Sequence, residues 1–360
     1  MAPDIRPHRP GARETARRAV PTHVGDSAGA VRAGSLRDVR LSHVIEVLEE
    51  LYPPSWAERW DAVGLVCGDP GQEVGRVLFA VDPVAAVADE ALEWGADLVI
   101  THHPLLLRGV TSVAATTPKG RLVHRMIRNG VALYTAHTNA DVADPGVSDA
   151  LARAVGVTGP LRPLAPDADD PRRGLGRIGE LPEPMPLSDF TARAAAGLPA
   201  TAWGVRAAGD PARTVRTVAV CGGAGDSLLD AARAAGVDVY LTADLRHHPA
   251  SEFAEHDGPA LVDAAHWATE WPWLADAERR LTEAWAGGPE TRVSTIVTDA
   301  WRLHGASPVP DARPSGAEPA AGVPLGAGPQ TPGAAPELTT TPGVDPRTPG
   351  AAPGVSEGAK

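Results

Sequence analysis

The sequence predicts an α/β protein made of two related lobes, and three observations support this fold class. Short apolar runs that fit buried strands alternate with amphipathic stretches that fit helices, and glycines separate them. The connections between these runs are short, which is typical of a sheet covered by helices. In addition, residues 77–101 align with residues 218–242 without a gap. The simplest account is a strand–helix–strand unit that occurs once in each half of the chain.

The first half is expected to begin with a helix and to continue as alternating strands and helices. Apolar residues between Leu41 and Leu51 recur at helical spacing, with Ser42 as the expected N-cap and Pro53–Pro54 as the end. The elements expected next, in chain order, are a strand at 77–81, a helix at 85–94, a strand at 98–101, a helix at 122–128 and a strand at 131–135.

The second half repeats this order, and its residues match at the same places. Gly95-Ala96-Asp97, which precedes the second strand of the first unit, corresponds to Gly236-Val237-Asp238 in the second unit. Between the halves, residues 157–215 are rich in Pro and Gly. We interpret this stretch as a linker with one helix at 187–196.

Both ends of the chain differ from its centre. Residues 1–35 carry six Arg and three acidic residues, without the apolar segment of a secretory signal. Residues 305–360 contain 12 Pro and 10 Gly and repeat hexamers of the type TPGAAP, a composition that buries too little apolar surface to fold. The sequence therefore predicts a disordered extension at 1–35, a first lobe at 36–156, the linker at 157–215, a second lobe at 216–304 and a disordered tail at 305–360.

Charge and composition exclude several classes of function. A formal net charge of −12 argues against bulk electrostatic binding of nucleic acid or of anionic lipid. The absence of an 18-residue apolar run predicts no membrane-spanning helix, and we expect a cytoplasmic protein. The two cysteines, Cys67 and Cys221, cannot form a disulfide framework or a thiolate zinc cluster. Any metal is therefore expected on His, Asp and Glu side chains.

Histidines and acidic residues gather where predicted strands end. Taken alone, a histidine at a strand end is usually a hydrogen-bonded surface residue, and a lone acid such as Glu270 is usually a helix N-cap. Together, imidazoles and carboxylates are ligands that Zn²⁺, Fe²⁺, Mn²⁺ and Co²⁺ accept, and two carboxylates allow one to bridge two ions. The residues of this set are His102, His103, His137, Asp141, His266 and Glu270.

Four motifs in order resemble the GTP cyclohydrolase 1 type 2-like family, also called the YbgI-like dinuclear metal-centre proteins. They are Trp60-Asp61-Ala62-Val63-Gly64-Leu65, Ile100-Thr101-His102-His103-Pro104-Leu105, Ala136-His137-Thr138-Asn139-Ala140-Asp141 and Asp263-Ala264-Ala265-His266-Trp267-Ala268-Thr269-Glu270. The resemblance covers about residues 36–300 and departs from the family pattern at Ala62, Ala265 and Ala243, none of which removes a ligand.

The resemblance implies two αβα lobes with a dinuclear metal site in the cleft between them, and a homohexamer. Carried over by motif, the metal ligands are His102, His103, Asp141, His266 and Glu270, with Glu270 as the bridge. His137 corresponds to a neighbouring residue that supports a ligand or faces the substrate.

Two functions of different kinds follow from these expectations. The first is a metal-dependent hydrolase that acts on a small-molecule, nucleotide-like substrate, with His137 and His248 as acid–base residues. The alternative is a metal-dependent oligomeric scaffold or regulatory protein without catalysis, because fold and metal do not determine function. The glycine-rich turn at 222–225 is interpreted as a tight strand–helix turn, with a phosphate cradle as the second reading.

Overall fold

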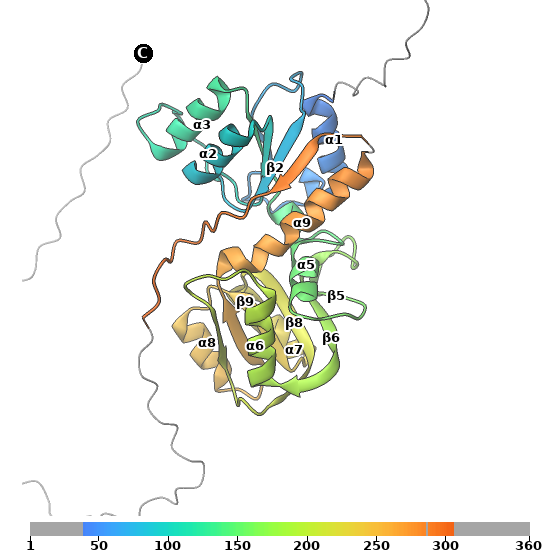
Figure 1. Cartoon of the computed structure of the whole chain (residues 1–360). Helices are drawn as coiled ribbons and strands as arrows, with labels where there is room; N and C mark the ends of the chain where they lie inside the picture. The colour runs from blue at the N-terminus through green and yellow to red at the C-terminus, as the bar shows by residue number, and fades with distance from the viewer. Residues whose placement is uncertain (1–38, 286, 306–360) are drawn as a thin grey trace, which may run out of the picture. The chain divides into compact units, whose positions relative to one another are not determined.

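The computed structural model describes residues 39–285 and 287–305, which form two α/β lobes (Figure 1). In order across the first sheet, the strands are β1 (Gly64–Cys67), β4 (Ala132–Thr135), β3 (Leu98–Thr101), β2 (Arg76–Ala80) and β11 (Glu290–Val293). Across the second sheet they are β5 (Arg162–Pro166), β6 (Gly174–Pro186), β8 (Thr214–Ala224), β9 (Val239–Ala243), β10 (Ala260–Ala264) and β7 (Val205–Ala208).

Helices alternate with these strands along the chain. Those that precede or follow first-sheet strands are α1 (Leu41–Leu51), α2 (Ala85–Trp94), α3 (Pro118–Arg128), α4 (Thr138–Asp141) and α5 (Val147–Ala154). Those of the later chain are α6 (Leu187–Gly197), α7 (Leu229–Ala235), α8 (His247–Ala254) and α9 (His266–Ala284), with 3₁₀ turns at Pro54–Trp56 and Asp226–Leu228.

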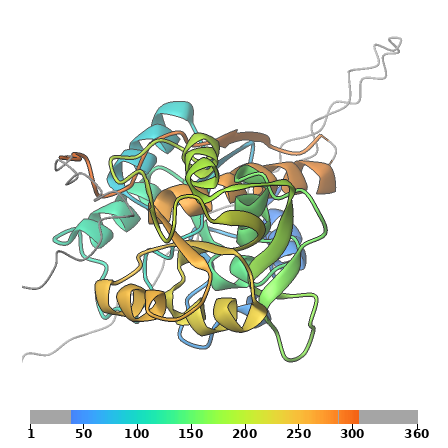
Figure 2. The same cartoon turned by 90° about the horizontal axis from the view of Figure 1, so that it is seen from below.

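Successive strand residues point to opposite faces of a sheet. In both sheets, helices pack against the two faces, so both sets of residues are buried. In the first sheet, Leu78 and Val99 face α2 and α3, whereas Phe79 and Ile100 face α1 and α9. In the second sheet, Tyr240 packs with α7 and α8 while Val239 packs with α6, and Figure 2 shows α6 on the opposite side of this sheet from α7 and α8. Strands buried on both faces explain the continuous apolar runs of the sequence.

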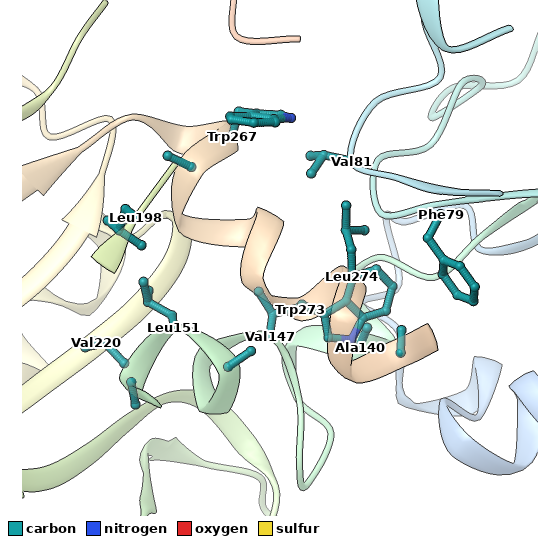
Figure 3. Close-up of a cluster of buried hydrophobic side chains, with 14 of the residues drawn as sticks. Phe79, Val81, Ala140, Val147, Leu151, Leu198, Val220, Trp267, Trp273 and Leu274 are labelled. Atoms are coloured by element: carbon teal, nitrogen blue, oxygen red, sulfur yellow. The ribbon is translucent and has the colours of Figure 1, made fainter. Parts of the chain in front are cut away.

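Helix α9 joins the cores of the two lobes. It contacts β8 and β9 of the second sheet and then β2 and β11 of the first. In Figure 3, Leu198 lies on the side of the helix start, Val220 lies beside Leu151, and Phe79 lies on the opposite side, beyond Leu274 and the buried Trp273 in the middle of the helix. One continuous hydrophobic cluster thus includes residues of both sheets.

The predicted repeat is confirmed by the strand registers. Val77 of β2 is opposite Leu98 of β3, and Val218 of β8 is opposite Val239 of β9, in parallel pairs. These four residues are equivalent in the ungapped alignment of the two halves. The α/β class and the two related lobes are therefore as the sequence predicts.

The domain limits differ from the expected ones in two places. Residues 157–215 do contain the predicted helix, α6, but they also supply β5, β6 and β7 of the second sheet, so they are part of a lobe and not a linker. Residues 290–293, which lie within the expected second lobe at 216–304, form strand β11, and β11 pairs with β2 of the first sheet because α9 carries the chain back to it. Both errors concern pairing partners that are distant in sequence.

Smaller differences occur at helix starts. Helix α1 has the predicted bounds, but Arg40 and not Ser42 occupies its N-cap position. Helix α3 begins four residues earlier than expected, because Thr117 accepts a hydrogen bond from Gly120 N and Pro118 occupies the first turn.

The predictions for 1–35 and for the tail after Gly305 lie outside the described residues. Within the described residues, no helix combines the length and apolarity needed to cross a bilayer.

Candidate metal centre

The predicted ligands converge at the carboxyl end of β3, the loop after β4 and the first turns of α9. His102 and His103 directly follow β3, and Asp141 ends the short helix α4 that follows β4. His266 begins α9, and Glu270 lies one turn later on the same helix face. Side chains beyond the carboxyl ends of neighbouring parallel strands meet at one sheet edge, which is why residues so distant in sequence come together.

His102 is a fully buried imidazole that faces two carboxylates. Its Nδ1 lies 3.0 Å from the carbonyl oxygen of Ala136 and donates to it, since a carbonyl only accepts. Its Nε2 lies 3.5 Å from Glu270 Oε1 and 3.6 Å from Asp141 Oδ1. This Nε2 makes no hydrogen bond to any described residue. A buried imidazole nitrogen without a partner that faces two carboxylates is an arrangement that a divalent cation would satisfy.

His103 and His266 approach Glu270 from the two lobes. Their Nε2 atoms lie 3.1 Å from Glu270 Oε2 and 2.9 Å from Glu270 Oε1, respectively, and 3.3 Å from each other. Two imidazole nitrogens bound to one tetrahedral ion at about 2.0–2.1 Å would lie about 3.3 Å apart. Each ring is fixed by a carboxylate on its other nitrogen: Asp82 accepts from His103 Nδ1 at 2.7 Å, and Asp244 accepts from His266 Nδ1 at 2.8 Å.

The electrostatic field of the site favours cations. Burial lowers the pKa of His103, but the carboxylates of Glu270 and Asp82 outweigh it and raise the pKa to about 10. The Glu270 carboxylate, with Asp244, raises the pKa of His266 to about 11 against the effect of burial. Burial alone would raise the pKa of Glu270, but the neighbouring imidazoles hold it well below its usual range. The field that retains protons on these rings would equally attract a divalent ion, which displaces protons when it binds.

The donor atoms therefore fit a metal site. His103, His266 and Glu270 form one group able to hold an ion, and His102, His103 and His137 form another. Asp141 is in neither group, although its carboxylate reaches His102. The structure thus assembles all six residues singled out in the sequence, and it brings His137 nearer to a possible ligand position than expected.

His137 is held by Asp61, which the sequence motif also contains. Asp61 Oδ1 lies 2.9 Å from His137 Nδ1, and Asp61 Oδ2 accepts from the backbone and hydroxyl of Thr138. Although burial opposes ionisation, these bonds hold the pKa of Asp61 below its usual range. An ionised carboxylate only accepts, so His137 Nδ1 carries its hydrogen and Nε2 is the atom free for chemistry.

A cavity of about 430 Å³ opens onto this centre. His137, His266 and Glu270 line it together with Trp60, whose side chain is 59% exposed and lies edge-to-face with His137 at 6.0 Å. The last residues of β8, Gly222–Ala224, form another part of the wall.

The structure does not bring His248 to this cavity. His248 is exposed on α8, and it is absent from the residues that line the cavity. Its predicted acid–base role therefore has no geometric support from this cavity.

The backbone N–H groups of the glycine-rich segment already have acceptors within the protein. The backbone N–H of Gly222 donates to Ser148 Oγ, and that of Gly223 donates to Thr269 Oγ1 at 2.9 Å. Since these donors are used, the segment does not offer them to a phosphate. The tight-turn interpretation holds only in part, because Gly222–Ala224 belong to β8 and the chain leaves this strand at Gly225 for the 3₁₀ turn at Asp226–Leu228. Gly223 has a further requirement for glycine: a Cβ there would lie 2.5 Å from Glu270 Oε1.

Sequence reasoning missed the carboxylates that orient the ligands. Asp82 and Asp244 each follow a strand, β2 and β9, as His102 follows β3. An acid just after a strand is the same kind of sequence signal as a histidine there. A search for such acids would have identified both Asp82 and Asp244.

Known proteins match this chain over the lobes that carry the site. The family model described as Duf34/NIF3 (NGG1p interacting factor 3) matches residues 39–300. A Streptomyces coelicolor protein named GTP cyclohydrolase 1 type 2 homolog is 60% identical, with 74% of this chain and 95% of that protein covered. A Mycobacterium tuberculosis protein of the same name is 42% identical, with coverage of 74% and 97%.

Solved structures show the same fold. A Staphylococcus aureus protein, SA1388, is 27% identical with a TM-score of 0.68, over 74% of this chain and 99% of that one. A Bacillus cereus protein related to NIF3 is 24% identical with a TM-score of 0.69, over 74% of this chain and all of that one.

Proposed function

The chain belongs to the Duf34/NIF3 family, and from this premise we propose that it is a metal-dependent hydrolase that acts on a nucleotide-like substrate. The observation that carries the proposal is the convergence of imidazole nitrogens on a buried carboxylate. His102, His103 and His266 each direct Nε2 towards Glu270, which is 3% exposed. Buried charges of this kind are retained where they are paired or bind metals.

We propose two divalent ions, with Glu270 shared between them. His102 and Asp141 would hold one ion, and His103 and His266 the other. The donor set of nitrogen and carboxylate oxygen suits Zn²⁺, Fe²⁺, Mn²⁺ or Co²⁺. When bound, such ions supply Lewis-acid chemistry and lower the pKa of a coordinated water.

The residues of the cavity would bind the substrate and move a proton. The hydrogen bond to Asp61 leaves His137 Nε2 able to accept a proton from the attacking water and return it to the leaving group. Trp60 offers an exposed aromatic face at the same cavity, on which a planar base can stack. The names of the relatives, GTP cyclohydrolase 1 type 2 homolog, support a purine nucleotide as the substrate class.

Turnover by reconstituted protein tests this function. The purified chain is stripped with a chelator, reloaded separately with each of the four metals, and assayed with GTP and a panel of phosphoesters and amides. We expect turnover with at least one metal, and we expect His137→Gln to lower kcat by about 10²–10⁴-fold while its metal content stays at the wild-type level. His248→Gln, on exposed α8, is the matched control and should leave kcat unchanged. Loaded protein that turns over no substrate would contradict the proposal.

The proposal includes the hexamer that the family resemblance implies and the cytoplasmic location expected from the sequence. Light scattering should then give about six times the 37.2 kDa mass of one chain.

A non-enzymatic scaffold or regulatory protein is the second candidate. One observation favours it, because the family description names an interacting factor. Binding of a partner protein that is unchanged by His102→Ala, in a chain without turnover, would support this candidate.

A further inference from the structure

A segment near the end of the described chain is fixed against the first lobe. After β11, the backbone N–H of Ser294 donates to the carbonyl of Phe79 at 2.8 Å, and its hydroxyl donates to Glu90 Oε2 at 2.6 Å. Trp271 Nε1 donates to the carbonyl of Ser294 at 2.9 Å. Ser294 is buried and therefore holds this segment to β2, α2 and α9 at once.

Four residues later, the same segment reaches the candidate metal centre. The hydroxyl of Thr298 donates to Asp82 Oδ2, while Asp82 Oδ1 accepts from His103 Nδ1. The two oxygens of one carboxylate thus connect the C-terminal segment to an imidazole whose Nε2 faces Glu270. Thr298 is thus linked to His103 through the Asp82 side chain and its two hydrogen bonds.

The corresponding support of His266 is different. Its partner Asp244 has a side chain that is 58% exposed, and among the described residues it accepts a side-chain hydrogen bond from His266 alone. Asp82 is about a quarter exposed and is held on both oxygens. A carboxylate with both oxygens bonded has one orientation, so it determines the plane of the imidazole that it binds.

From these contacts we propose that Thr298 is a positioning residue for the metal centre: its hydroxyl holds Asp82, and Asp82 orients His103 towards the ion that His103 shares with His266. This inference rests on the proposed metal site but not on turnover. Partners that orient ligating histidines affect metal affinity by about 10–100-fold when they are removed. The C-terminal segment would therefore set the affinity of one ion and leave that of the other, held by His102 and Asp141, close to its original value.

Metal affinity of matched variants tests the proposal. Thr298→Val removes the hydroxyl at nearly constant volume, Thr298→Ser keeps it, and Thr295→Val changes an exposed threonine of the same segment. Zn²⁺ affinities are measured by competition with a chromophoric chelator, and the Co²⁺ absorption spectrum reports the ligand geometry. We expect Thr298→Val to weaken one of two ions by about tenfold or more, with Thr298→Ser and Thr295→Val within about twofold of the wild type, and with unchanged melting of the metal-free proteins.

A double-mutant cycle distinguishes positioning from a loss of structure. In an Asp82→Ala background, Thr298→Val should have no further effect on Zn²⁺ affinity, because the connection is already broken. A Thr298→Val effect of the same size in that background, or wild-type affinity for both ions in the single variant, would overturn the proposal. If the wild type binds both ions but turns over no substrate, the hydrolase proposal fails and the role of Thr298 is still decided. If the wild type binds no ion, both proposals fail.

Discussion

The strand–helix–strand units of the two lobes share their structural devices but differ where their strands end. In both units a glycine with positive φ ends the helix, Gly95 at 74° and Gly236 at 65°. In both, an aspartate then accepts two backbone N–H groups at the start of the first strand. Asp97 binds those of Gly75 and Arg76, and Asp238 binds those of Arg216 and Thr217, all at 2.7–2.9 Å. These devices occupy equivalent positions, so the repeat preserves the scaffold.

The strand ends carry the difference. Where the first lobe has His102-His103 after β3, the second has Ala243-Asp244 at the equivalent positions. Where the first lobe has Asp82, the second has Gly223, which leaves room for Glu270. One lobe therefore supplies ligands from its strand ends, and the other supplies them from α9. A duplicated scaffold can therefore carry a site whose two halves have different ligands.

Substitution of Gly223 should have the largest effect on this asymmetry. A Cβ at position 223 would lie 2.5 Å from Glu270 Oε1 and 3.1 Å from His266 Nε2, so Gly223→Ala should displace both groups. We expect Zn²⁺ affinity to fall by about tenfold or more. Gly204→Ala is the control, since Gly204 has a similar φ of 69° and open space around it. Equal Zn²⁺ affinity in the two variants would show that Glu270 and His266 can bind the ion without the space left by Gly223.

A buried ion pair between α5 and β6 should contribute more to stability than an exposed ion pair between β6 and β8. Arg177 is buried, binds Asp149 at 2.8 Å and donates to the carbonyl of Ala143, which ties α5 to β6. Arg177→Met leaves Asp149 buried without its partner, and we expect a loss of about 3–5 kcal/mol in the free energy of unfolding. The exposed pair of Arg216 with Glu180 is the control, and Arg216→Met should cost less than about 1 kcal/mol. Urea denaturation measures both, and similar costs would contradict this difference in burial.

The equivalent aspartates offer the most direct test of the shared scaffold. Asp97→Ala and Asp238→Ala each remove a carboxylate from two backbone N–H groups, and each should cost about 1–2 kcal/mol of unfolding free energy. Unequal costs would show that the two devices are not energetically equivalent.

The cost of Asp238→Ala should also depend on pH. Burial opposes ionisation of Asp238, but the N–H groups of Thr217 and Arg216 outweigh it and lower the pKa of its carboxyl. A lowered folded-state pKa stabilises the fold above the unfolded value, about 3.9, and this stabilisation is lost as the pH falls through the folded value. The difference between wild type and Asp238→Ala should therefore be full near pH 6 and shrink below about pH 4. A constant difference over this range would contradict the account.

The sequence predicted local structure and the site better than it predicted long-range pairing. Periodicity identified α1, α2 and the central strands because their burial repeats at helical or strand spacing. It could not identify β11 as a strand of the first sheet, since that pairing with β2 depends on the path of α9. The short strands β5 and β7 lie at sheet edges and lack the continuous apolar run of a central strand.

The convergence of these histidines and acids was predictable because their side-chain types and strand-end positions coincide. All six histidines and acids of the sequence set lie at the centre, as described above. His248 was predicted beside them, but it is exposed on α8 and does not line the cavity that opens onto the centre. Asp82 was missed although it follows a strand as the histidines do, and the structure shows its role through the contact with His103.

The central claim is that Glu270 is shared by two metal ions, and metal analysis tests it most directly. Metal per chain is measured by mass spectrometry of the reconstituted wild type, of Glu270→Gln, and of Glu283→Gln as an exposed control on the same helix. We expect two ions per chain in the wild type and the control, and one or none in Glu270→Gln. Two ions retained in Glu270→Gln would contradict it.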